Sequence, residues 1–292
     1  MSLPIEPTGD RTFIYQEASV IASMNELPRE LLLEIFSYLN FTSLEASSLV
    51  SKEWKQLASD PLVQKKVVYQ DIAFSNKKWA ICFGKESVKG EDLKEEFFSL
   101  PNDIFKILKS PCLAFPGKRV IDTHVLVRIP KTLSGQHLTL STLGAVAKRY
   151  FPDSQTGYGL IPRLIVNELG DKPLEKSQWV LMTKDVLPGS RKKKYEVQLG
   201  LVADLAKETQ SPYTVPSALQ AAVCILAQHF NFKTGLFSDK PWTYYTYTRC
   251  QENFYGDQVQ VGSWDAEGGL QFDHTPSTCE RHSIGMAALR KL

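Results

Sequence analysis

Cysteine is scarce in this chain and shows no paired spacing. The 292 residues contain five cysteines, Cys82, Cys112, Cys224, Cys250 and Cys279. Their number is odd, and no two of them form a CxxC motif. A disulfide framework or a common structural zinc site needs such spacing. The sequence therefore favours free thiols in a reducing compartment, and we expect a cytoplasmic protein.

Long apolar runs and a strong net charge are also missing. No run approaches the roughly 18 apolar residues that a membrane-spanning helix needs. Residues 1–20 lack the basic start and apolar stretch of a secretory signal peptide. The formal net charge is only +2, which gives no electrostatic reason to expect a nucleic acid or a membrane as partner.

Signatures of nucleotide binding and of repeat folds are absent as well. Neither G-x-x-x-x-G-K-[ST] nor G-x-G-x-x-G occurs. No leucine-rich, WD40 or kelch period is found. We therefore expect no cofactor, and the sequence does not identify a target-binding module by its repeats.

Three regions with different residue patterns follow one another along the chain. Residues 1–23 carry turn-forming residues without sustained periodicity and are predicted to form a flexible tail. Residues 24–69 show dense helical periodicity, and residues 70–292 mix strand and helix patterns. The predicted fold class is α+β, with a small N-terminal all-α unit of three or four short helices and a larger mixed domain with a largely antiparallel sheet.

The helical unit begins with an amphipathic segment. Leu32, Ile35, Phe36 and Leu39 stand at positions i, i+3, i+4 and i+7, which is the spacing of one apolar helical face. Pro28 suits the first turn of that helix, because its missing N–H costs nothing there. Asn40 and Ser51 are expected to cap a second and a third helix.

This unit resembles the F-box along its whole length. The family pattern is a Leu-Pro-x-Glu start, an apolar helix ending in Tyr-Leu, then Leu, Val-Ser, and a Trp followed by Leu-Ala. The matching positions are Leu27, Pro28, Glu30, Ile35, Tyr38, Leu39, Leu44, Val50, Ser51, Trp54, Leu57 and Ala58. Two positions depart from it: Phe41 stands where proline is common, and Gln64 stands where many members have a second Trp.

The resemblance implies a function. An F-box binds the Skp-type adaptor of a cullin–RING (SCF) ubiquitin ligase, so this chain would be a substrate adaptor that presents an unknown target protein, and not an enzyme. The residues that the resemblance assigns to adaptor binding, or to holding the helices for it, are Leu27, Pro28, Ile35, Leu39, Leu44, Val50 and Trp54.

The larger domain is expected to combine several strands and helices. Strands are predicted over residues 78–83, 123–129, 178–182, 244–250, 258–264 and 270–273, with a hairpin turn at 266–269. Helices are predicted over 139–151 and 190–208 and after Pro216, and residues 283–290 are expected to close the sheet. The domain looks like a C-terminal module of F-box proteins from intracellular bacteria, which implies an effector acting in a host cytoplasm.

Aromatic residues gather near the start of the C-terminal strands. Because neighbouring residues of a strand point to opposite faces, they do not all fit into the core of a one-sided sheet. Exposed aromatic side chains are favoured anchors at interfaces. Trp242, Tyr245 and Tyr247 are therefore the predicted target-binding residues.

Two alternatives to a plain adaptor remain open. One is an enzyme that the F-box only delivers, with Cys250 or Cys279 as nucleophile and His274 or His282 close by. No known nucleophile motif surrounds either cysteine, and the spacing of His274, Cys279 and His282 matches no familiar zinc site, so no metal is expected. The other alternative is a decoy that occupies the adaptor and recruits nothing.

Overall fold

The computed structural model describes residues 27–150, 153–232, 236–237, 246–265 and 269–292. The chain divides into two compact units, residues 1–67 and 68–292, here called unit 1 and unit 2. The tail predicted for residues 1–23 and the hairpin turn predicted at residues 266–269 lie wholly or mainly outside the described residues.

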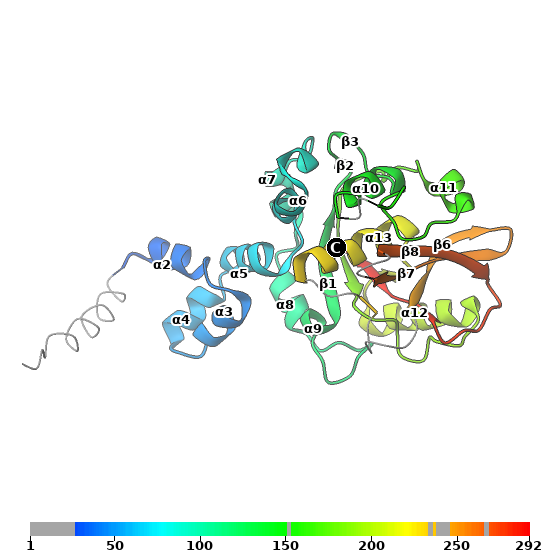
Figure 1. The fold of residues 1–292 in the computed structure, drawn as a ribbon. Helices are drawn as coiled ribbons and strands as arrows, with labels where there is room; N and C mark the ends of the chain where they lie inside the picture. The colour runs from blue at the N-terminus through cyan, green and yellow to red at the C-terminus, as the bar shows by residue number, and fades with distance from the viewer. Residues whose placement is uncertain (1–26, 151–152, 233–235, 238–245, 266–268) are drawn as a thin grey trace, which may run out of the picture. The chain divides into compact units, whose positions relative to one another are not determined.

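The described residues of unit 1, 27–67, form short helices joined by turns. Its helices are α2 (Arg29–Phe36), α3 (Phe41–Ser47), α4 (Lys52–Ala58) and α5 (Pro61–Val67). Figure 1 shows them, coloured from blue to cyan, as short helices. Helices of two turns are unstable alone, so they depend on packing against one another. Four short helices were within the range predicted from the sequence.

Unit 2 mixes helices with two four-stranded sheets. The first sheet has the order β1-β4-β10-β5 and is entirely antiparallel. The second has the order β8-β7-β6-β9, with an antiparallel meander β6-β7-β8 and a short parallel pairing of β6 with β9. The α+β class with largely antiparallel sheets is thereby confirmed.

The elements of unit 2 run as follows. The helices are η1 (Val68–Ile72), α6 (Asn76–Phe83), η2 (Lys85–Val88), α7 (Leu93–Ser99), α8 (Ile104–Lys109), α9 (Val120–Thr123), α10 (Leu140–Ala147), α11 (Arg163–Leu169), α12 (Tyr195–Thr209) and α13 (Ala218–Phe232). The strands are β1 (His124–Ile129), β2 (Thr132–Leu133), β3 (Gln136–His137), β4 (Gln178–Thr183), β5 (Tyr213–Thr214), β6 (Tyr247–Phe254), β7 (Asp257–Asp265), β8 (Gly269–Pro276), β9 (Ile284–Gly285) and β10 (Leu289–Lys291). None of the described helices is long and apolar enough to cross a membrane.

Helix α13 is the centre of unit 2. Every residue from Ala218 to Gln228 is buried, so this helix is surrounded on all sides. It contacts β1 of the first sheet and β6, β7 and β8 of the second, and Figure 1 shows it (yellow) in the middle of the unit. A helix that is apolar all round is a core helix, which explains why LQAAVCILA lacks a polar face.

The C-terminal segment joins the two sheets. Strand β9 pairs with β6 in the second sheet, and β10 pairs with β4 in the first. Between them, Met286 to Ala288 are fully buried. Thr183 fastens this crossing, since its N–H donates to the Ala288 carbonyl and its hydroxyl accepts from the Ala288 N–H. Residues 283–290 were expected to close one sheet, and instead they divide between two.

Gly285 is required at this crossing because no space exists for a side chain. A Cβ atom built there would lie 2.6 Å from the Cβ of buried Val186. We expect Gly285→Ala to lower the free energy of unfolding by about 1–3 kcal/mol, the usual cost of overpacking a core. Chemical denaturation of the full chain measures this loss.

Gly200 supplies the matched control. It lies inside α12 with nothing within 4 Å of a built Cβ. Alanine has the higher helix propensity, so Gly200→Ala should raise the free energy of unfolding by about 0.5–1 kcal/mol. Equal effects of the two substitutions would contradict the packing argument.

One predicted strand is wrong. Residues 78–83 were expected to be extended, but they belong to helix α6. Trp79 and Phe83, four residues apart, are both buried on one helical face, and the Trp79 indole N–H donates to the Arg128 carbonyl at 3.0 Å. A six-residue run of apolar and aromatic residues suits either structure, and here the buried helical face decided.

The start of the helix predicted at residue 190 is also wrong. Helix α12 begins at Tyr195, and the basic run from Arg191 to Lys194 precedes it, with Lys192 at a φ of +56°. Arg191 is half-buried: it donates to the Thr246 hydroxyl at 2.8 Å and pairs with Asp185 at 3.6 Å. The helices α7, α8, α9 and α11 were not predicted at all, since each spans at most seven residues.

Candidate functional site

Helix α2 begins one residue after Pro28, which the sequence pattern had placed in the first turn. Pro28 occupies the N-cap position with a φ of −52°, and Glu30 lies in the first turn. A carboxylate there is favoured by the helix dipole. Leu32 and Phe36, one turn apart, are 5% and 1% exposed and face the interior of unit 1.

Side-chain caps fix the next two helices. The Asn40 side chain accepts from the Ser43 N–H at 2.8 Å at the start of α3, and the Ser51 hydroxyl accepts from the Trp54 N–H at 3.1 Å at the start of α4. Each cap satisfies a backbone donor that the helix leaves unpaired. Both caps were predicted from the sequence.

The two departures from the family pattern have structural roles. Phe41, in place of proline, is 2% exposed and belongs to the core. Gln64, in place of a second Trp, donates from Nε2 to the Ala58 carbonyl at 2.9 Å and so closes the C-terminal end of α4. Asp60 caps α5 by accepting from the Leu62 N–H at 2.9 Å. Neither departure leaves a gap in the helical unit.

The interior of unit 1 is complete without a partner. Leu32, Phe36, Leu44 and Leu57 are each at most 5% exposed. The Trp54 ring packs edge-on against Phe36, with 5.2 Å between the ring centroids. Edge-to-face packing of this kind is favourable for aromatic pairs. Leu44, one of the predicted adaptor-binding residues, therefore holds the helices together and does not face outward.

A second group of apolar residues in unit 1 points outward. Leu31 and Ile35 lie one turn apart on the side of α2 away from the core, and they are 47% and 39% exposed. The remaining exposed large apolar side chains among residues 27–67 are Tyr38, Leu49, Val50 and Leu62. We call these six residues the exposed apolar set. Single exposed apolar residues are common, but six in so small a unit are typical of a binding surface.

Tyr38 is held by neighbours that leave its ring accessible. Its hydroxyl donates to the Glu34 carboxylate at 3.5 Å, and the Lys66 ammonium lies 4.9 Å from its ring centroid. The ring is nevertheless 69% exposed. An exposed and partly fixed aromatic ring loses little conformational entropy on binding, which is why tyrosine is frequent in hot spots.

The predicted adaptor-binding residues thus separate by location. Pro28, Ile35 and Val50 are exposed. Leu27, Leu39 and Trp54 are half-buried, and Leu44 is in the core. No measurement tests their contact with an adaptor, so that assignment stays a prediction.

Leu31 and Leu62 were missed by the sequence interpretation. The run Leu31-Leu32-Leu33 carries the signal for the first of them, because three consecutive helical residues never share one face. At least one leucine had to point away from the core. Leu62 follows the Asp60-Pro61 break, where the helical periodicity restarts. The sequence therefore does not show which face of the new helix is buried.

The predicted target-binding residues in unit 2 are only partly described. Trp242 and Tyr245 lie outside the described residues. Tyr247 begins β6, is half-buried, and donates from its hydroxyl to the Gln271 side chain at 2.7 Å. Tyr247 therefore has a structural bond within the second sheet, and its role in target binding stays a prediction.

Cys250 and His274, two of the candidate catalytic residues, have separate surroundings. Cys250 is fully buried, and burial raises the pKa of its thiol well above the usual value. Its sulfur lies 3.8 Å from the Thr248 carbonyl, whereas His274 pairs with Asp257 at 2.9 Å. A fully buried thiol whose pKa is raised is a small hydrophobe and a poor nucleophile.

The zinc alternative finds no support either. Within the described ranges no three His, Cys, Asp or Glu side chains gather in a way that could hold a metal ion. His282 is exposed, and Cys279 is half-buried with its carbonyl accepting from Arg249 at 2.5 Å. These residues act as loop and hydrogen-bonding groups in the structure.

Comparison with known proteins bears on unit 1 only. The F-box-like family model matches residues 24–70. Neither the curated proteins nor the solved structures gave a match to the chain. The matched range contains all four helices, both side-chain caps and the exposed apolar set. Residues 24–70 of this chain are therefore an F-box-like domain.

Proposed function

We propose that this protein is a substrate adaptor of a cullin–RING ubiquitin ligase, with unit 1 bound to the Skp-type adaptor and unit 2 holding a target protein. The exposed apolar set carries the proposal. Unit 1 has a complete interior, and yet it presents six further large apolar side chains. Transferring one such side chain from water into an interface is favourable by roughly 1.5–3 kcal/mol.

The contribution of the chain is proximity and not chemistry. A target held by unit 2 would meet the ubiquitin carrier of the ligase at a high effective concentration, which by itself accelerates transfer. Burial of Cys250 and the separate pairing of His274 support a role without catalysis. A ubiquitin probe that reacts with catalytic cysteines should leave the chain unlabelled, and labelling at Cys250 or Cys279 would favour the delivered-enzyme alternative.

The direct test is binding of the purified full chain to a Skp-type adaptor, by pull-down and then by calorimetry. Ile35→Asp replaces one member of the exposed apolar set by a charged residue. We expect its affinity to fall by roughly thirtyfold or more, which corresponds to a hot-spot loss of about 2 kcal/mol. Because Ile35 is 39% exposed, the variant should still fold.

Leu199→Asp is the matched control, since Leu199 is also 39% exposed and also lies on a helix, α12 of unit 2. It should bind the adaptor like the wild-type chain. The proposal fails if the folded wild-type chain does not bind, or if Ile35→Asp binds with unchanged affinity.

A decoy differs from a substrate adaptor only in its effect on the turnover of target proteins. Both an adaptor and a decoy bind through unit 1, but only an adaptor shortens the half-life of proteins that bind unit 2. We expect proteins cross-linked to unit 2 in cells to accumulate when the chain carries Ile35→Asp. Unchanged abundance of every cross-linked protein would favour a decoy.

The effector role implied by the likeness of unit 2 to bacterial modules is a further part of the proposal, and detection of the chain in a host cytoplasm during infection would test it.

A further inference from the structure

Three lysines lie at the start of helix α12, where positive charge is unfavourable. Lys194 is the N-cap residue, and Lys192 and Lys193 precede it. The N-terminal end of a helix carries a partial positive charge, so a cation there is destabilising and an anion is stabilising. Lys192 also has a φ of +56°, a left-handed conformation that lysine rarely adopts. Local stability therefore gives no reason for lysine at these three positions.

The start of α12 also lacks a cap. Lys194 has no side-chain oxygen that could accept from the first turn, and no side chain caps this helix. The Tyr195 N–H donates to the Ser277 carbonyl at 2.9 Å. The N–H groups of Glu196 and Val197 have no acceptor among the described residues, and both residues are exposed. Two backbone donors are thus available to an oxygen atom of another molecule.

A second segment adds its charge at the same place. Residues 277–282 run beside residues 191–195, since the Lys192 N–H donates to the Arg281 carbonyl at 3.2 Å. The exposed cations of the two segments, here called the basic patch, are Lys192, Lys193, Lys194 and Arg281. None of them forms an ion pair with a described carboxylate. All four charges are therefore free to meet a partner.

A buried cation adjoins the basic patch. The Arg249 side chain is fully buried, and it donates to the Lys193 carbonyl of one segment and to the Cys279 carbonyl of the other. Its Nε–H has no acceptor within the described part of the chain, and no carboxylate there pairs with it. A buried charge normally has a partner of opposite sign. An anion held at the patch would lower the cost of this buried charge.

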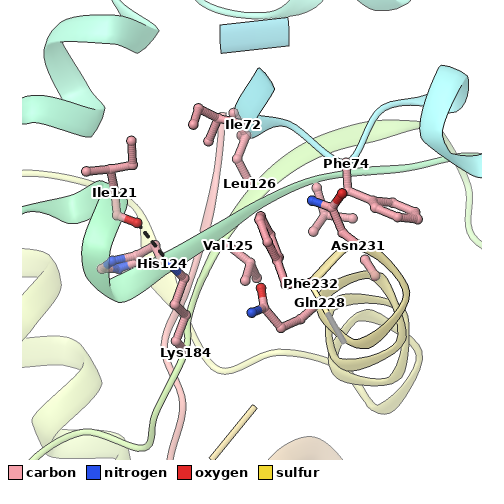
Figure 2. A pocket seen from close by; sticks show the side chains of 12 residues that line it. Ile72, Phe74, Ile121, His124, Val125, Leu126, Lys184, Gln228, Asn231 and Phe232 are labelled. Carbon is pink, nitrogen blue, oxygen red and sulfur yellow. Dashed lines mark hydrogen bonds between the residues drawn. The ribbon is translucent and has the colours of Figure 1, made fainter. Parts of the chain in front are cut away.

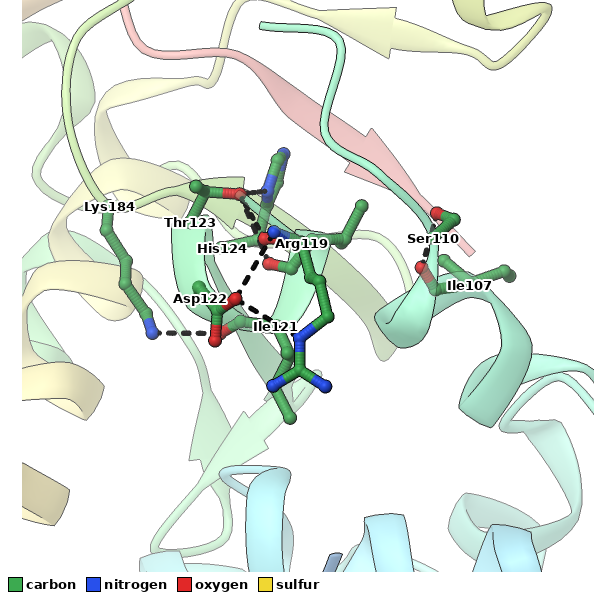
Figure 3. A network of polar contacts seen from close by, with 9 residues as sticks. Ile107, Ser110, Arg119, Ile121, Asp122, Thr123, His124 and Lys184 are labelled. Carbon is green, nitrogen blue, oxygen red and sulfur yellow. Dashed lines mark hydrogen bonds and ion pairs between the residues drawn. The ribbon is translucent and has the colours of Figure 1, made fainter. Parts of the chain in front are cut away.

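Other partly buried cations of unit 2 have carboxylates nearby. Figure 3 shows the Lys184 ammonium beside Asp122. The same lysine lines the mainly apolar hollow between β1 and α13 that Figure 2 shows. Arg128 has Glu96 close enough for electrostatic attraction. Of these three cations, only Arg249 lacks such a carboxylate among the described residues.

The charge balance favours a short acidic segment as the partner. The basic patch and Arg249 carry five cations, and only two exposed carboxylates, Glu196 and Glu280, belong to the same stretches of chain. The whole chain has a net charge of only +2, so positive charge is concentrated here and attracts anions. A continuous anionic surface, such as a membrane or a nucleic acid, would also meet the two carboxylates and be repelled by them. A peptide can place its own carboxylates between them.

We propose that the basic patch and the open N-terminus of α12 bind an acidic segment of the target protein. One carboxylate of that segment accepts from the Glu196 and Val197 N–H groups, and so supplies the cap that Lys194 cannot provide. Further carboxylates lie against the other cations of the patch. The inference rests on the proposed function, for which it supplies the chemical class of the target segment.

The probes are short fluorescent peptides in which every second residue is Asp or Glu, and the same peptides with Asn or Gln at those positions. We expect the full-length chain to bind the acidic peptides in fluorescence anisotropy. The affinity should fall by about tenfold or more in the triple variant Lys192→Gln/Lys193→Gln/Lys194→Gln.

A matched control removes the same charge elsewhere in unit 2. Lys131→Gln/Lys148→Gln/Lys176→Gln changes three exposed lysines outside the basic patch. It should bind the acidic peptides like the wild-type chain. Equal losses in the two triple variants would show a general charge effect and would overturn the proposal.

Stability separates a binding role of the lysines from a structural one. Lys194→Asp places a carboxylate of the chain's own at the N-cap, so it should raise the midpoint of thermal unfolding of unit 2 and weaken peptide binding by about tenfold. The triple variant at residues 192–194 should unfold at no lower a temperature than the wild-type chain. A lower midpoint in both variants would mean that the lysines serve the fold, which would overturn the proposal.

Three binding results would also overturn it: no acidic peptide binds, the Asn and Gln peptides bind equally well, or the triple variant at residues 192–194 keeps wild-type affinity. Vesicles containing phosphatidylserine and single-stranded RNA are tested in parallel. Binding of either one without binding of the acidic peptides would assign the patch to that partner instead. None of these results affects the adaptor-binding test of Ile35→Asp, so failure of this inference and failure of the proposed function are distinguishable.

Discussion

Phe36→Ala should unfold unit 1 while unit 2 keeps its own unfolding transition. The Phe36 side chain is 1% exposed and carries the edge-on packing of Trp54. Removing a buried phenyl ring costs about 3–5 kcal/mol, through lost burial and the cavity left behind. A helical unit of about 40 residues has only a few kcal/mol of stability to lose.

Two measurements report the outcome together. Adaptor binding should disappear, and denaturation followed by far-ultraviolet circular dichroism should lose the transition of unit 1. Leu31→Ala, on the same helix but at a 47% exposed residue, is the control and should shift stability by no more than about 0.5 kcal/mol. If Phe36→Ala bound the adaptor at wild-type affinity, the adaptor-binding surface of unit 1 would not depend on its buried interior.

Arg249→Met should be the most damaging single substitution on the second sheet. The Arg249 side chain is fully buried and donates to the Lys193 carbonyl at 3.1 Å and to the Gln198 side chain at 3.0 Å. It also donates to the carbonyls of Pro276 and Cys279. The guanidinium thereby ties the start of α12 and the segment after β8 to β6.

The expected loss follows from the acceptors that remain. A buried acceptor left without a donor costs about 1–3 kcal/mol, and a partly buried one costs less because water reaches it. The Gln198 contact is buried and the three carbonyl contacts are partly buried, so we expect Arg249→Met to lower the free energy of unfolding by about 3–5 kcal/mol. Arg249→Lys keeps the charge but loses the planar fork, and it should recover only part of this. The first measurement is urea denaturation of unit 2.

Arg163→Met provides the comparison, because Arg163 is exposed at the start of α11. Its effect should stay within about 0.5 kcal/mol. A small effect of Arg249→Met would mean that neutral packing replaces the buried cation at little cost. That outcome is known for some buried charges, and burial indeed lowers the pKa of the Arg249 guanidinium.

The sequence by itself determined unit 1. Its helices follow from local signals: Pro28 at the start of α2, Asn40 and Ser51 as caps, and apolar residues at helical spacing. These signals act over three or four residues, and all of them agree. When local signals agree in this way, a short segment specifies its own fold.

Strands buried on both faces were also readable from sequence. Strands β1 and β4 appear as runs of apolar residues, HVLVRI and QWVLMT, with nearly every residue buried. Their pattern matches that of core strands. By contrast, residues 78–83 have a similar composition and form α6, because Trp79 and Phe83 reach the core only from a helix.

Tertiary structure alone decided which surfaces are open. The sequence assigns Leu44 and Val50 to the same group, but packing puts one in the interior and leaves the other 64% exposed. The pairing of β1 with β4 on one side and its bridge to Phe74 on the other depend on which alternate residues of β1 face β4. Register and edge pairing arise between segments distant in the chain, so no local pattern encodes them.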